Sequence, residues 1–342
     1  VVYKGSAETT ASEVPVSSFD SPDPENLWKA MSAYEARTGD EVLAIPHNGN
    51  LSNGMMFETK RIDGRGFDAE YAKTRARWEP LVEVTQIKGD GETHPTLSPN
   101  DEFADYETWD TSNLGGNEAK TDDMLPGEYA RSALRIGLEV EAQTGVNPYR
   151  FGMIGSTDSH TALATSREEN FFGKHSGMEP TPTRMTDALA KVGDTAVFGW
   201  QQVASGLAAV WAVENTRAAL FEAMERRETY ATTGTRMRVR FFAGFDFEQR
   251  DLAEPDWAVM AYAKGVPMGG VLGKAGWRDK PGLLVRALRD PDGANLDRIQ
   301  IVKGWIGSDG ESHEKVYDVA LSGGRVVGKD GRAPAVGNTV DV

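Results

Sequence analysis

The chain has 342 residues, with 52 acidic and 37 basic side chains, a formal net charge of −15 and no cysteine. This charge argues against a nucleic-acid backbone as partner, whereas a small anionic substrate stays compatible because local charges override the global sign. The lack of cysteine excludes disulfides, thiolate metal sites and cysteine nucleophiles.

Hydrophobic residues make up 39% of the chain and charged residues 26%, which is typical of a soluble globular protein. No apolar run approaches the roughly 18 residues of a membrane span. The length predicts two domains. The compartment stays open, because a cysteine-free chain is compatible with a secreted, periplasmic or cytoplasmic protein.

Three segments of the first half share one layout, a helix, then a strand, then a polar residue just past the strand. In the first segment, Asp23 as N-cap and Pro24 as first helical residue predict a helix that ends at Gly39. A strand over residues 41–45 follows and leads to His47.

The second and third segments repeat this order. Residues 67–78 read as a helix stopped by Pro80, and the β-rich run "LVEVTQIKG" then leads to His94. Residues 128–144 read as a helix closed by Gly145, and the strand "YRFGMIGS" leads to "TDSH".

This alternation predicts parallel βα units, and in such folds the active site gathers at the carboxyl ends of the strands. The rule therefore brings His47, His94, Asp158 and His160 to one face. A fourth helix over residues 216–228 completes a first domain predicted to span residues 1–236.

After residue 236 the chain turns into short strands separated by Gly, Pro, Asp and Asn turns. The expected strands are "MRVRFFAGFDF", "WAVMAYAKGVPMGG", "GLLVRALRD", "LDRIQIVKGW" and "EKVYDVAL". They predict an antiparallel, β-rich and sandwich-like module over residues 237–342, cut short at its carboxyl end.

Asp158 and His160 form the clearest candidate site. In an extended segment residues i and i+2 point the same way, so the carboxylate and the imidazole can bind one ion. A surface Asp-Ser-His turn is the alternative. His47 and His94 are expected to complete the ligand set, although His47 also fits a loop cap and His94 an ordinary turn.

Five further residues are candidates for contact with the ligands or the substrate. Glu83, on an apolar strand, is interpreted as a ligand, a partner of a ligand or a solvent-facing residue. Arg167 suits an anionic substrate group or a surface salt bridge. The complete set is Glu83, Asn48, Asn50, Arg167 and His175.

Imidazole and carboxylate without thiolate suit Zn²⁺, Mn²⁺ or Fe²⁺ acting on bound water, and hydrolysis is the reaction that such a site supports. Asp158 and His160 are the predicted catalytic residues. No GxSxG, Walker A or GxGxxG motif favours another chemistry. Such a site polarises a phosphoryl or a carbonyl oxygen, so phosphoesters, amides, esters and lactones are all compatible substrates. A non-catalytic binding or surface protein with a degenerate barrel is a third reading.

The stretches "AIPHNGNLSNGMMF", "GETHPTLSPNDEFADYETWD" and "FGMIGSTDSHTALATSREENFFGKHSG" resemble an uncharacterised family, domain of unknown function number 3604, related to the polymerase-and-histidinol-phosphatase superfamily. The resemblance implies a distorted β/α barrel, a centre of two or three metals and phosphoester hydrolysis. His47 looks like the superfamily's Ala-His-Pro histidine, His94 like the histidine after its Glu-bearing strand, and Asp158 with His160 like its terminal Asp-x-His.

One departure from the superfamily pattern concerns its opening His-x-His motif. That motif is absent, since the first histidine of this chain is His47. The resemblance therefore implies an incomplete barrel whose amino-terminal part precedes Val1, with reduced metal occupancy as the consequence.

Overall fold

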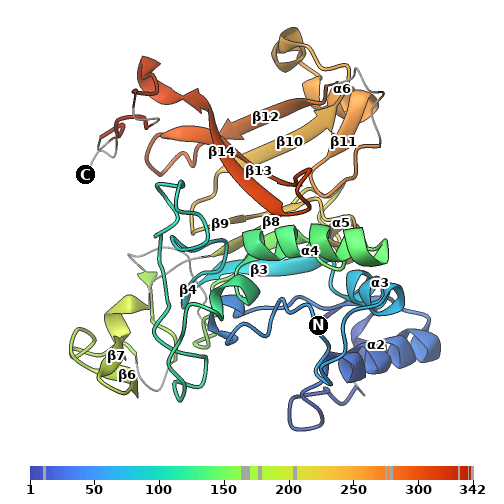
Figure 1. The fold of residues 1–342 in the computed structure, drawn as a ribbon, viewed down its shortest axis with the longest axis vertical. Helices are drawn as coiled ribbons and strands as arrows, with labels where there is room; N and C mark the ends of the chain where they lie inside the picture. The colour runs from blue at the N-terminus through green and yellow to red at the C-terminus, as the bar shows by residue number, and fades with distance from the viewer. Residues whose placement is uncertain are drawn as a thin grey trace.

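The computed structural model describes residues 1–10, 13–162, 170–175, 179–202, 206–273, 276, 280–329, 332–337 and 339. Across these residues it is a mixed α/β structure with six α-helices and six small sheets (Figure 1). The mixed α/β class predicted from the sequence is therefore confirmed.

The predicted helices of the first domain form where their capping residues place them. Asp23 accepts a hydrogen bond from the backbone N–H of Glu25 and begins the first long helix, and Gly39 ends it at a φ of 74°. Gly145 ends the third at a φ of 78°. The four predicted helices are α2 (Pro24–Thr38), α3 (Ala69–Trp78), α4 (Ala130–Thr144) and α5 (Arg217–Glu225), and the short α1 (Ala7–Thr10) was not predicted.

The central sheet contains the one parallel pair among the described strands. Strand β3 (Leu81–Gln86) pairs in parallel with β5 (Gly152–Gly155), and the short β4 (Gly89–Asp90) returns antiparallel to β3. β8 (Leu207–Val210) and β9 (Thr229–Thr232) form an antiparallel pair. The Thr229 hydroxyl donates to the Met153 carbonyl at 3.2 Å, so β9 lies beside β5.

The strand expected before His47 is shorter than predicted and is not part of a parallel sheet. It is β2 (Val42–Leu43), which pairs antiparallel with β1 (Val2–Tyr3). The chain after β2 still reaches the central sheet, because the Glu83 N–H donates to the Pro46 carbonyl at 3.0 Å. The described residues close no barrel, and parallel pairing is confirmed only for β3 with β5.

The second half is antiparallel, as predicted. One sheet has the order β11 (Gly265–Pro267), β10 (Arg238–Gly244) and β12 (Gly282–Leu288), and β13 (Arg298–Ile306) with β14 (Ser312–Leu321) forms a hairpin. The strand expected over "WAVMAYAKGVPMGG" is wrong in its first part, which is helix α6 (Trp257–Lys264). Trp257 and the fully buried Ala261, four residues later, lie on the helix face that packs on Phe242. Because residues four apart share one face only in a helix, this packing favours helix over strand.

Helix α4 lies between the central sheet and the β13–β14 hairpin (Figure 1). Its Ala130 and Ala133 are buried in one cluster with Val82 and Val84 of β3. Buried Arg131, on the same helix, donates to Glu314 of β14 at 2.7 Å. The sheet that carries the candidate site is thus covered by a helix that contacts β3 on one side and the β13–β14 hairpin on the other.

Candidate functional site

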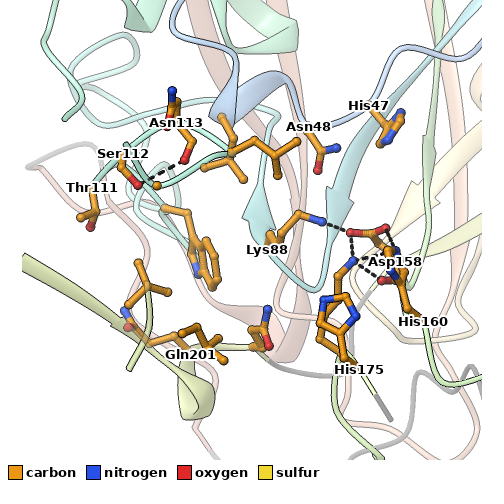
Figure 2. A pocket seen from close by; sticks show the side chains of 18 of the residues that line it. His47, Asn48, Lys88, Thr111, Ser112, Asn113, Asp158, His160, His175 and Gln201 are labelled. Carbon is orange, nitrogen blue, oxygen red and sulfur yellow. Dashed lines mark hydrogen bonds and ion pairs between the residues drawn. The ribbon is translucent and has the colours of Figure 1, made fainter. Parts of the chain in front are cut away.

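A cavity of about 470 Å³ lies beyond the carboxyl ends of β3 and β5 (Figure 2). Segments far apart in the chain line it, among them the β6 (Ala188–Val192) and β7 (Thr195–Phe198) hairpin through one residue of each strand. Its charged and imidazole-bearing residues are His47, Lys88, Asp158, His160, Lys174 and His175. This position agrees with the rule for sites of parallel βα units.

The Asp158 carboxylate is the centre of the polar contacts. The ammonium groups of Lys88 and Lys174 both form ion pairs with its Oδ2 atom. His160 Nε2 lies 3.2 Å from Asp158 Oδ1 and 3.1 Å from Lys174 Nζ. The predicted meeting of Asp158 with His160 is confirmed, but the extended geometry expected for it is wrong, because Asp158 has a φ of 49°. A left-handed turn brings the two side chains together.

The two lysines are nearly buried, with Lys88 8% and Lys174 4% exposed. Lys88 follows β3 directly, and its carbonyl accepts a hydrogen bond of 3.0 Å from the Asn50 amide. Burial and the neighbouring Lys174 lower the pKa of Lys88 to about 7, and burial also lowers the pKa of Lys174. The Asp158 carboxylate pairs with both lysines, and the nearby Glu83 carboxyl acts in the opposite direction to burial by raising the pKa of each.

The pKa values of the histidines around this pair are lowered, which favours the neutral imidazole. Partial desolvation and then the Lys88 ammonium lower the pKa of His47, which stands at the cavity edge. Partial desolvation and the ammonium of Lys174 likewise lower the pKa of His160, whose ring meets that of His175 edge to face at 4.9 Å. Neutral imidazoles are the state that accepts protons, so these rings have the form that a general base needs.

Three of the remaining candidates lie at or behind the cavity wall. Asn48, with a φ of 61°, lines the cavity and accepts a hydrogen bond from the Gln86 amide. Asn50 is 2% exposed and supports the backbone of Lys88 instead of lining the cavity. Glu83 accepts from the Ser156 hydroxyl, and burial raises the pKa of Glu83.

His94 lies apart from the other candidates. Its ring is buried, accepts from the Thr96 N–H at 3.1 Å and lies 3.3 Å from the Asp110 carboxylate. It does not line the cavity. The structure thus brings His47, Asp158, His160 and His175 together but places His94 elsewhere, and Arg167 lies outside the described residues.

The side chains of the cavity differ from a metal-ligand set in two ways. Within the described ranges no group of three or more His, Asp or Glu residues is placed to hold a metal ion. The one carboxylate of the cavity faces the ammonium groups of Lys88 and Lys174, which repel a cation. As placed, these side chains do not fit a divalent-metal centre, and the ion expected from the sequence stays a prediction.

Sequence reasoning missed Lys88, Lys174 and Trp109. A signal for Lys88 exists, since a lysine followed by glycine ends the apolar strand in "VTQIKGD". Lys174 stands next to the candidate His175, which is a weaker signal. Trp109 lines the cavity from a long connection whose sequence carries no periodic pattern.

The family model described as "Protein of unknown function (DUF3604)" matches residues 1–342. The chain belongs to this family. No curated protein and no solved structure matches it significantly. Among the residues that the structure describes, no helix has both the length and the apolar character needed to cross a membrane.

Proposed function

We propose that this member of the family hydrolyses small phosphoesters in the cavity at the ends of β3 and β5. One observation carries the proposal, the convergence of two nearly buried lysines with His47, His160 and His175 at one cavity. The relation to phosphoester-hydrolysing proteins expected from the sequence motifs supports the same reaction.

The lysines account for the choice of an anionic substrate. A phosphoryl group entering the cavity meets the amino groups of Lys88 and Lys174, and its negative charge favours the protonated form of Lys88, whose pKa is about 7. Charge-assisted hydrogen bonds contribute about 1.5–3 kcal/mol each. The net charge of −15 on the chain favours a small anion over a polyanion as the ligand of this cavity.

The imidazoles account for hydrolysis. His47, kept neutral, takes a proton from the water that attacks phosphorus. The bond between phosphorus and the ester oxygen breaks, and the alcohol leaves after taking up a proton from solvent. Lys88 and Lys174 stabilise the charge that develops on the phosphoryl oxygens during this step.

The first test measures hydrolysis of p-nitrophenyl phosphate and binding of inorganic phosphate by calorimetry. Lys174→Met is expected to weaken phosphate binding about 10–100-fold, the equivalent of one lost charge-assisted contact. His47→Gln is expected to lower kcat about 100-fold or more with little change in KM. Lys73→Met, which removes an exposed lysine of α3, is the matched control and leaves both values unchanged.

The assays are run with and without added Mn²⁺ or Zn²⁺, because such an ion has to displace two ammonium groups from Asp158. Phosphate binding that is equal in wild type and Lys174→Met contradicts the proposal. Failure to hydrolyse any phosphoester under either condition also contradicts it, and turnover of lactones or amides instead assigns the site to acyl chemistry.

A further inference from the structure

The cavity has two chemically different ends. Figure 2 shows Lys88, Asp158 and His175 on one side and Ser112 with Asn113 on the other. A volume of about 470 Å³ falls within the roughly 300–1,000 Å³ of pockets that enclose a whole small molecule. The end away from the lysines is therefore available for the alcohol part of the substrate.

We infer that this alcohol is a hydroxyl-rich ring and that the preferred substrate class is the sugar phosphates. The inference rests on the proposed function for the phosphoryl end only. It is carried by an aromatic side chain next to Lys88 and by the neutral hydroxyl and amide side chains around it.

The aromatic side chain is Trp109, whose position depends on the glycine after Lys88. Gly89 has a φ of 95°, and a Cβ there would lie 2.9 Å from Trp109 Cδ1 and 2.5 Å from the Glu107 carbonyl oxygen. The Asp90 N–H fixes that carbonyl at 3.0 Å. The indole thus lies directly against the backbone that carries the ammonium group. An indole face carries partial negative charge, which attracts the polarised C–H bonds of a sugar ring.

The wall around Trp109 combines aliphatic side chains with polar side chains that carry no charge. Hydroxyl and amide side chains both donate and accept hydrogen bonds, as sugar hydroxyls do. The Gln201 side-chain oxygen accepts from the Phe198 N–H at 2.8 Å, which orients its amide N–H groups away from that bond. The polar lining residues of this part are Thr108, Thr111, Ser112, Asn113, Gln201 and Gln202.

The hydroxyl and amide side chains of the lining also distinguish between classes of alcohol. An alkyl phosphate offers no hydroxyl group to them. A nucleoside phosphate presents a flat base that requires donors and acceptors in one plane instead of hydroxyls spread around a ring.

The test measures binding by calorimetry, so that it does not depend on turnover. Glucose 6-phosphate, methyl phosphate, adenosine 5′-monophosphate and inorganic phosphate are compared on the full chain. Glucose 6-phosphate is expected to bind at least about 10-fold more tightly than methyl phosphate. Trp109→Ala is expected to abolish this preference by weakening the binding of glucose 6-phosphate more than that of methyl phosphate. Trp305→Ala on β13 is the matched control and retains the preference.

The outcomes separate the two proposals. Equal binding of glucose 6-phosphate and methyl phosphate overturns the sugar-phosphate inference while phosphate binding and hydrolysis still stand. Tighter binding of adenosine 5′-monophosphate that depends on Trp109 overturns it in favour of a nucleotide. If the wild-type protein binds none of the four anions, the proposed function and this inference are both overturned.

Discussion

The ion pair of Lys120 with Glu128 allows a quantitative prediction about the support of the cavity. Lys120 Nζ lies 2.6 Å from each Glu128 carboxylate oxygen and 2.7 Å from the Asn50 carbonyl oxygen. The two side chains are 2% and 0% exposed. Since Asn50 in turn holds the Lys88 carbonyl, this buried pair lies directly behind the proposed phosphate site.

Lys120→Met removes the cation and leaves the Glu128 carboxylate buried without a counterion. The expected loss in the free energy of unfolding is about 3–5 kcal/mol, the range for breaking a buried pair. The double variant Lys120→Met/Glu128→Leu is expected to recover much of this loss, because no unpaired charge then remains. Lys120→Met is also expected to weaken phosphate binding, since the Asn50 support of Lys88 is disturbed.

Urea unfolding followed by circular dichroism measures the change through the midpoint and the slope. Arg150→Met is the matched control, because Arg150 pairs with Glu141 on the surface at 44% and 37% side-chain exposure. That variant is expected to lose no more than about 1 kcal/mol. A loss below about 1 kcal/mol for Lys120→Met, with an unchanged slope, refutes the reasoning.

Two further predictions concern buried charges. Burial raises the pKa of Asp90 to about 8, so its stabilising contribution is complete below the ordinary pKa near 3.8 and is lost as pH rises through about 8. The free energy of unfolding of the wild type is expected to fall with pH by about 1.4 kcal/mol per pH unit at its steepest, and Asp90→Asn is expected to flatten this decline. Unfolding measured between pH 5 and 9 tests this. Parallel profiles for the two proteins contradict the assignment. Arg131→Met leaves Asp101 and Glu314 unpaired and is expected to cost about 3–5 kcal/mol. Adding Glu314→Leu is expected to restore part of that loss in a double-mutant cycle, and strict additivity argues against the contact.

The sequence predicted local elements well because their signals lie within a few residues. Asp23 and Gly39 mark the two ends of α2, and Gly145 marks the end of α4, through hydrogen bonds and backbone angles that involve near neighbours only. The same kind of signal failed for α6, since a short apolar run is compatible with strand and helix, and packing on Phe242 decided between them.

For the site, the sequence showed that polar residues follow the strands. It did not show which direction the chain takes after each strand. It placed His47, Asp158 and His160 together, as the structure does. It also placed His94 there, but the chain reverses at Gly89 into β4, and the His94 ring packs beside Tyr129 at 5.5 Å between centroids.

The tertiary structure alone decided the charge of the site. Lys88 and Lys174 belong to separate segments, and only folding brings both ammonium groups to the Asp158 carboxylate. The sequence gives the type of each side chain and the local turns directly. The electrostatic potential in the cavity, by contrast, depends on distances between segments that are remote in the chain. Composition and spacing do not contain those distances, and for that reason the sequence did not show that two lysines meet the Asp158 carboxylate.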